Sequence, residues 1–357
     1  MIKMNLEDLG WDSYFEKEFE THKDSNLIPL RITRENRQDY LAHGEGGEVR
    51  AEVSGRYRYE AENRGQFPTV GDWVAVSPAQ NGGPAIIQAL LPRKSAFVRK
   101  TAGENTEEQV VAANIDIVFI VCGLDNNFNP RRVERYLSLA WESGAVPVVL
   151  LNKADLCAEV SRRQEEIESV AIGVAVHAMS AAGGQGLEMV KSHISGGRTA
   201  AFLGSSGVGK STIINALIGE ERLAVGAVRE YDSRGRHTTT SRELVFLSGG
   251  GLVIDTPGMR EIQVWGDEKG LERAFEDIER LAEECRFRDC MHQQEPGCAV
   301  QNAIMNGTLD AGRFRSYLKL KKEMHYLSVR QNVKANLMEK KKWKRISILA
   351  KKMQKKY

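Results

Sequence analysis

Eight residues near the middle of the chain strongly limit how the surrounding segments can fold. They read Gly-Ser-Ser-Gly-Val-Gly-Lys-Ser at 204–211 and match the pattern G-x-x-x-x-G-K-[ST]. An apolar run, Ala200–Leu203, precedes them, and an amphipathic run, Thr212–Leu217, follows and is closed by Gly219. This order predicts a strand, a glycine-rich loop and a helix, with backbone N–H groups and the helix N-terminus directed at phosphates. The predicted nucleotide contacts are Gly204, Ser205, Ser206, Gly207, Val208, Gly209, Lys210, Ser211 and Thr212.

A second pattern, Asn152-Lys153-Ala154-Asp155, indicates which base accompanies those phosphates. It follows the apolar run Val146–Leu151, which we expect to be a strand. Parallel strands bind ligands at their carboxyl ends, so this base loop and the phosphate loop are expected at one edge of a sheet. The Asp155 carboxylate can accept hydrogen bonds from N1–H and the 2-amino group of guanine, whereas adenine offers neither donor. An unpaired buried charge costs roughly several kcal/mol, so the pattern predicts guanine.

Neighbouring residues complete the predicted base site. Asn152 is expected to join the base loop to the phosphate loop, and the stem of Lys153 is expected to lie against the base. Ser180 and Ala181 follow another apolar run, Val174–Ala178, and could offer backbone N–H groups to the guanine O6.

Two further segments are typical of switch segments, which change conformation when a γ-phosphate is bound or lost. The segment Asp255–Gly258 ends the apolar run Leu252–Ile254, so Asp255 could hold a water on Mg²⁺ while the Gly258 N–H reaches the γ-phosphate. Residues 229–240 are polar and rich in breakers, which predicts a loop that the γ-phosphate orders. The expected hydroxyl ligands of Mg²⁺ are Ser211 and one threonine among Thr238, Thr239 and Thr240, with Thr239 preferred.

No glutamine occupies the position that often orients the attacking water. Many GTPases place one directly after the switch glycine, but Met259 and Arg260 stand there in this chain. His237, in the preceding loop, is the internal candidate, and the alternative interpretation is an ordinary surface histidine.

The region from 110 to 265 alternates apolar strand-like runs with amphipathic ones. Expected strands include Ile115–Cys122 and Thr199–Leu203, and Asn129–Pro130 is typical of a helix start. The alternation predicts an α/β fold with a mainly parallel sheet and helices on both faces. Because the base loop precedes the phosphate loop, the reverse of the order in small GTPases, we predict a circularly permuted domain over 96–265.

The flanking regions differ in pattern. Residues 36–95 alternate polar and apolar positions at Val49–Val53, Tyr57–Tyr59 and Val74–Val76, which predicts short strands in a small barrel. A helical lead is expected over 1–35. A helical domain is expected over 266–333, where Phe314, Tyr317, Leu318, Met324 and Leu327 recur at helical spacing.

Three of the five cysteines lie close together near a histidine. Cys285, Cys290, His292 and Cys298 are spaced C-x4-C-x-H-x5-C. Three thiolates and one imidazole are typical of a tetrahedral zinc site that leaves no position for water, so one structural Zn²⁺ is predicted. The alternative is a buried group with a chance histidine, but the polar residues beside these cysteines favour the metal.

The charge is unevenly distributed along the chain. The formal net charge is +2, yet residues 334–357 carry ten Lys/Arg against Glu339, which leaves −7 for the rest. This basic tail, with Trp343 and Tyr357, is expected to contact RNA, the alternative being a solvated tail. No apolar run reaches the roughly 18 residues that span a bilayer, and Met1–Glu20 lacks a secretory pattern, so we expect a cytoplasmic protein with no membrane partner.

These motifs together resemble one family, the ribosome small-subunit-dependent GTPase A family of bacterial circularly permuted GTPases. The resemblance covers most of the chain and also rests on Gly71-Asp72-Trp73-Val74 and Gly235-Arg236-His237-Thr238-Thr239. It implies an oligonucleotide-binding (OB-fold) barrel before the GTPase domain and a zinc domain after it. It further implies a monomer that binds GTP and GDP with Mg²⁺, and GTP hydrolysis stimulated by the small (30S) ribosomal subunit, with 16S rRNA as a partner, during late subunit maturation.

Two other functions stay open on the sequence alone. Because Met259 replaces the usual glutamine, the chain could act as a GTP-liganded rRNA-binding placeholder with negligible turnover. Hydrolysis measured with and without small subunits separates the two. An ATPase would share the phosphate loop, but Asn152–Asp155 argues against it, and competition by GDP but not ADP would decide.

Overall fold

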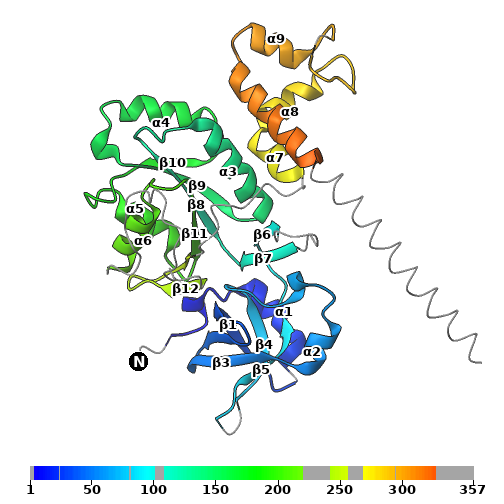
Figure 1. Cartoon of the computed structure of the whole chain (residues 1–357), viewed down its shortest axis with the longest axis vertical. Helices are drawn as coiled ribbons and strands as arrows, with labels where there is room; N and C mark the ends of the chain where they lie inside the picture. The colour runs from blue at the N-terminus through cyan, green and yellow to red at the C-terminus, as the bar shows by residue number, and fades with distance from the viewer. Residues whose placement is uncertain are drawn as a thin grey trace, which may run out of the picture. The chain divides into compact units, whose positions relative to one another are not determined.

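The computed structural model describes residues 4–23, 25–79, 82–100, 108–219, 242–255, 268–293 and 295–326. The chain divides into two compact units, Met1–Gln263 and Val264–Tyr357. The first unit contains a β-barrel and an α/β layer, and the second is helical (Figure 1). Among the described residues no helix is both long and apolar enough to cross a membrane.

The barrel lies in the first unit and is closed. In the described part of the chain its strands pair in the order β1–β2–β3–β5–β4, and β4 returns to β1. A closed barrel of five strands is the architecture of the OB-fold, as predicted. Leu30, Ile32, Val74, Val76 and Ile87 fill its interior. The strands are β1 (Ile28–Glu35), β2 (Tyr40–Gly44), β3 (Gly47–Val53), β4 (Trp73–Ser77) and β5 (Ala85–Leu90).

Two predictions for this region are wrong. Strand β1 begins at Ile28, inside the 1–35 segment expected to be a helical lead, whose main helix is α1 (Ser13–Lys23). The apolar residues Leu30 and Ile32 of β1 alternate with Arg31 and Thr33, a period of two that is itself a strand signal. Tyr57 and Tyr59 belong to helix α2 (Gly55–Glu60) rather than to a strand, because the Ser54 hydroxyl caps this helix by accepting the Tyr57 N–H at 3.0 Å.

The α/β layer has the predicted architecture. Its sheet runs β10–β9–β8–β11–β13–β12, with every neighbouring pair parallel except β12–β13 in the described residues. The strands are β8 (Ile117–Gly123), β9 (Val146–Asn152), β10 (Ala175–Ala178), β11 (Thr199–Leu203), β12 (Glu243–Phe246) and β13 (Leu252–Asp255). A hairpin of β6 (Ala96–Lys100) and β7 (Glu108–Ala113) joins this layer to the barrel. The helices are α3 (Pro130–Ser143), α4 (Val160–Glu168), α5 (Leu187–Ile194) and α6 (Lys210–Ile218).

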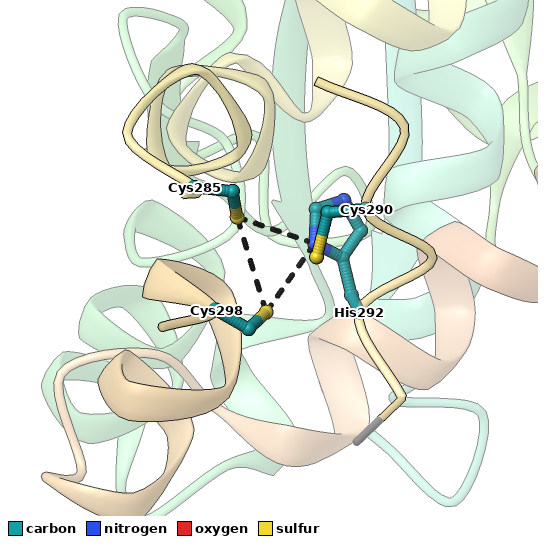
Figure 2. Close-up of side chains that lie close together, drawn as sticks. All are labelled: Cys285, Cys290, His292 and Cys298. Carbon is teal, nitrogen blue, oxygen red and sulfur yellow. Dashed lines mark hydrogen bonds between the residues drawn. The ribbon is translucent and has the colours of Figure 1, made fainter. Parts of the chain in front are cut away.

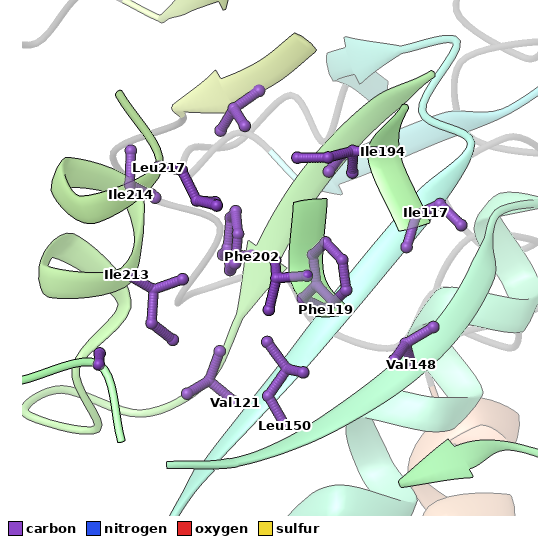
Figure 3. Packing of buried hydrophobic residues seen from close by; sticks show 14 of the residues in the cluster. Ile117, Phe119, Val121, Val148, Leu150, Ile194, Phe202, Ile213, Ile214 and Leu217 are labelled. Atoms are coloured by element: carbon purple, nitrogen blue, oxygen red, sulfur yellow. The ribbon is translucent and has the colours of Figure 1, made fainter. Parts of the chain in front are cut away.

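Helix α6 is held on the sheet by a dense apolar cluster (Figure 3). Phe119 and Phe202 stack at a centroid distance of 5.1 Å, and Ile213 and Leu217 of α6 pack on the same cluster. Each such buried side chain contributes about 1.5–3 kcal/mol relative to exposure. Gly219 ends the helix in the left-handed conformation with φ 83°, as its position predicted. The packing therefore fixes where the N-terminus of α6, and with it the phosphate loop, lies.

The barrel and the α/β layer are joined through buried polar contacts. The guanidinium of Arg31 donates to the carbonyl oxygens of Leu9, Gly71 and Asn114, which belong to three separate segments. Burial lowers the pKa of Arg31 to about 10, against the attraction of nearby carboxylates, so the group stays charged at neutral pH. Asp72 accepts two bonds from Arg93, at 2.8 and 2.7 Å. Gly71 and Asp72 of the Gly71–Val74 motif accept these bonds from Arg31 and Arg93, so the motif is structural.

The second unit is built from short helices. They are α7 (Glu268–Ala274), α8 (Glu276–Glu283), α9 (Ala299–Met305) and a helical stretch over 311–326. Phe314, Tyr317 and Met324 are buried there, as their spacing predicted, whereas Leu318 is 39% exposed. Leu327 and the basic tail, 334–357, lie outside the described residues.

Gly71→Ala is expected to destabilise the first unit by about 2–4 kcal/mol, because φ at Gly71 is +92° and an added Cβ would collide with the Ala113 carbonyl oxygen. Gly47→Ala is the matched control, since φ is +95° there but no atom lies within 4 Å of the added Cβ. The control should lose only about 1 kcal/mol, from backbone strain. Urea unfolding of both variants measures the difference, and equal losses would contradict the collision.

Candidate nucleotide site and metal cluster

The phosphate loop connects the end of β11 to the start of α6. Gly204, Gly207 and Gly209 adopt φ values of 151°, 76° and 100°, which favour glycine. A Cβ on Gly209 would collide with the side-chain amide of Asn152. The Lys210 ammonium donates to the carbonyl oxygens of Gly204 and Ser205 at 2.7 Å, so it lies across the loop. Ser211 and Thr212 stand in the first turn of α6, where phosphate oxygens meet helix N–H groups.

Asn152 joins the base loop to the phosphate loop, as predicted. The side chain is 3% exposed, and its Nδ2 donates to the Val208 carbonyl oxygen at 2.8 Å. Its Oδ1 accepts the Ala181 N–H at 3.0 Å. One buried amide therefore connects three loops that are distant in sequence. Because a buried amide left without partners is costly, the three loops are held in one arrangement.

Lys153 adds a second, charged connection between the same loops. Its backbone is left-handed, with φ 69°. Its ammonium donates to the Gly207 carbonyl oxygen and to Asp125 Oδ2, both at 2.6 Å. Burial acts to raise the pKa of the Asp125 carboxyl, but the hydrogen bonds from Lys153 and the Asn127 N–H outweigh it and hold the pKa below its ordinary value. Asp125 is therefore ionised at neutral pH and orients Lys153.

The remaining base-site residues lie at the same edge of the sheet. Asp155 is exposed on the short helical turn Ala154–Leu156, which follows β9. The Ser180 N–H donates to the Gln185 carbonyl oxygen at 3.1 Å, and the Ala181 N–H donates to Asn152. Both N–H groups predicted for the guanine O6 thus already have acceptors, so a base carbonyl would have to share or replace them. Asp155 therefore remains the predicted base contact.

Asp125 and Arg132 are site residues that the sequence analysis did not identify. Asp125 follows strand β8 at its carboxyl end, a position that the rule for parallel sheets could have indicated. Arg132, in the first turn of α3, donates from Nη1 to Ser205 Oγ at 2.8 Å. No local pattern indicates this contact, since 73 positions separate the two residues.

The predicted switch residues are described only in part. Asp255 is the last residue of β13, and its Cα pairs with Glu243 of β12. His237, Thr238, Thr239 and Gly258 lie outside the described residues.

The second unit contains the predicted cysteine and histidine cluster (Figure 2). The ligand atoms of Cys285, Cys290, His292 and Cys298 all lie within 4.8 Å of one another. His292 Nδ1 is 3.6 Å from the Cys285 sulfur and 3.5 Å from the Cys298 sulfur, and the two sulfurs are 3.9 Å apart. Ligands at tetrahedral corners around zinc lie about 3.6–3.8 Å apart, given metal–ligand bonds near 2.0–2.3 Å. The cluster can therefore hold a metal ion. Cys298 also caps α9 by accepting the Gln301 N–H at 3.4 Å.

Fold and site together define a circularly permuted P-loop GTPase: the base loop precedes the phosphate loop in the chain, yet the two meet at Asn152. The family model described as RsgA GTPase matches residues 90–265. A relative from Opitutus terrae, the small ribosomal subunit biogenesis GTPase RsgA, is 44% identical over 96% of each chain. A relative of the same description from Oceanobacillus iheyensis, RsgA 1, is 43% identical over 98% of this chain and 99% of its own. This chain belongs to the RsgA GTPase family and is a GTP-hydrolysing enzyme, as the resemblance implied.

Solved structures agree with the fold. YjeQ from Thermotoga maritima superposes with a TM-score of 0.63 at 25% identity, covering 84% of this chain and 98% of its own. YloQ, a circularly permuted GTPase, gives 0.61 at 22% identity, covering 87% and 98%. The model described as ABC transporter also matches, over 187–348, a range that contains the phosphate loop common to P-loop ATPases but lacks the base loop.

Asn152→Ala is expected to weaken GDP binding by about 2–3 kcal/mol, roughly a hundredfold in Kd, because Val208 and Ala181 each lose a buried partner. Binding of a fluorescent GDP analogue measures this. Asn36→Ala, which removes an exposed asparagine amide in a barrel turn, is the control and should bind as the parent does. A folded Asn152→Ala protein with parental affinity would show that the loops do not depend on this amide.

Proposed function

We propose that this GTPase acts in biogenesis of the small (30S) ribosomal subunit and hydrolyses GTP to GDP and phosphate in contact with 16S rRNA. The observation that carries the proposal is the extent of the similarity. Relatives named for small-subunit biogenesis align over nearly the whole chain, so the barrel and the metal cluster are included together with the GTPase domain.

Each part of the site has a role in this proposal. The Asp155 carboxylate reads guanine, and the phosphate loop with Lys210 binds the β- and γ-phosphates. The carboxylate of Asp255 holds a Mg²⁺-bound water, while the Gly258 N–H meets the γ-phosphate. Mg²⁺ would neutralise part of the negative charge that develops on the phosphate oxygens during hydrolysis. The proposed hydroxyl ligands of the ion are Ser211 and Thr239, with Thr238 beside them, and His237 orients the attacking water in place of the absent glutamine.

The domains divide the remaining work. The barrel, predicted over 36–95 and extended by β1 to Ile28, provides an RNA-binding surface, as OB-folds do. The GTPase domain covers 96–265, the zinc domain 266–333, and the basic tail 334–357 adds phosphate contacts. We expect the protein to act as a monomer in the cytoplasm, where ribosomal subunits mature.

Titration of GTP hydrolysis with purified small and large subunits, in separate series, tests the proposal. Small subunits should raise turnover by about a hundredfold, the effect of one well-placed group that stabilises the transition state, because Met259 leaves the chain without the usual glutamine. Large subunits are the matched RNA-rich control and should change it little. Equal effects of both would contradict a small-subunit role, and GTP-dependent binding without any increase in turnover would favour the placeholder function.

The cluster metal is proposed to be a single structural Zn²⁺, because three thiolates and one imidazole suit zinc. Metal analysis of the purified chain should find about one zinc per molecule, and Cys290→Ser should lose it and unfold the second unit. GDP binding should persist, because all the predicted nucleotide contacts belong to the first unit. Cys157→Ser, a cysteine outside the cluster, is the control and should retain the zinc. Retention of zinc by Cys290→Ser would refute this ligand set.

A further inference from the structure

Strand β12 lies between the nucleotide site and the barrel. On one side it pairs with β13, which ends at Asp255, and on the other side it meets β1 of the barrel. In the described residues a single register pair, Arg34 with Glu243, joins β12 to β1. Within these residues the joint therefore depends on side-chain contacts as well as on the ladder.

Two opposite-charge pairs reinforce the joint. Arg34 Nη2 lies 2.5 Å from Glu243 Oε1, and Arg242 Nη1 lies 3.6 Å from Glu35 Oε2. In each strand an arginine precedes a glutamate: Arg34 and Glu35 in β1, and Arg242 and Glu243 at β12. Because the two strands run antiparallel, each arginine faces the glutamate of the other strand. The side chain of Arg242 is only 12% exposed, and burial lowers its pKa. Solvent therefore screens these pairs less than it screens a pair on an open surface.

The other end of β12 is also held by the barrel. Phe246, its last residue, lies 5.2 Å from the His43 ring of β2, measured between ring centroids. Phe246 also packs on the apolar cluster that contains Trp73 and Phe15. Because β12 is four residues long, the barrel contacts both of its ends.

The joint continues directly to Asp255. Glu243 is the register partner of both Arg34 on one side and Asp255 on the other. These three residues form one row across β1, β12 and β13. A displacement of β12 at Glu243 would therefore move the end of the strand from which Asp255 is presented.

We infer that Arg34 and Glu243 are positioning residues for hydrolysis: their ion pair makes the barrel a fixed support for the strand end that carries Asp255. The inference rests on the proposed function, in which Asp255 holds a water on Mg²⁺. It assigns to the barrel a role in the GTPase reaction that is separate from binding RNA.

The Mg²⁺ dependence of GTP hydrolysis by the full chain, without ribosomal subunits, tests the inference. Arg34→Ala and Glu243→Ala should each raise the Mg²⁺ concentration for half-maximal turnover by about tenfold, the scale seen when support of a metal ligand is lost. GDP affinity measured without Mg²⁺ should stay parental, because the base loop is untouched. Arg34→Lys, which keeps the cation opposite Glu243, should retain most of the parental Mg²⁺ dependence. Arg50→Ala, which breaks an exposed barrel ion pair with Asp39, is the control and should behave as the parent.

Asp255→Asn separates failure of the inference from failure of the proposed function. Parental Mg²⁺ dependence in Arg34→Ala, beside a shifted dependence in Asp255→Asn, would overturn the inference alone. Parental dependence in Asp255→Asn would instead overturn the proposed role of Asp255. Should Arg34→Ala fail to fold, Arg34→Gln decides: a folded protein with a shifted dependence, beside a near-parental Arg34→Lys, supports the ion pair, and a parental dependence in Arg34→Gln overturns it.

Discussion

The nucleotide site depends on one buried amide. Asn152 donates to the phosphate loop and accepts from the loop that follows β10, so it fixes the separation of the segments that would bind the two ends of a nucleotide. The close approach requires glycine at position 209, since any side chain there would occupy the space of the amide. Lys153, held by Asp125, reinforces the same connection with a charge. Contacts within the chain therefore order this site before a nucleotide binds, and this lowers the conformational entropy that is lost when the nucleotide binds.

Permutation changes the route of the chain but not the geometry at this amide. The base loop precedes the phosphate loop by about fifty residues, yet both leave adjacent regions of one parallel sheet at its carboxyl edge. The new connections place a barrel before the sheet, and β1 of that barrel extends it beyond β12. The buried Arg31 of β1 strengthens this connection through the Asn114 carbonyl oxygen before β8, because losing its acceptors would leave a buried charge without partners. Barrel and GTPase domain therefore form one compact unit rather than two domains on a linker.

The second unit has a different source of stability. Its helices α7, α8 and α9 have seven or eight residues each, and its core is small, centred on Phe275, Tyr317 and Ile278. Units of this size generally need a metal or disulfide to stay folded. The four ligand atoms stand at spacings that suit a tetrahedral ion, and no disulfide is present among the described cysteines. The buried Arg313, bonded twice to Asp277, adds a further cross-link between helices.

Local signals in the sequence were sufficient for several features. The strand, loop and helix around 204–211, the cap at Asn129 and the metal ligands at 285–298 follow from residue types within a few positions of one another, where short-range sterics and hydrogen bonds decide. The joint of β12 with β1, the burial of Arg31 and the Arg132 contact could not be predicted in this way. Each depends on partners tens to hundreds of positions away, and tertiary packing overrides local preference at such sites. The helix at Tyr57 had a local signal, the Ser54 cap, which the polar and apolar alternation around it concealed. The sequence by itself determined the chemistry of the loops, the ligand set and the meeting of the base loop with the phosphate loop at Asn152. Only the tertiary structure decided that Asp125 and Arg132 join them and that β12 meets the barrel, because these contacts connect segments that lie far apart in the sequence.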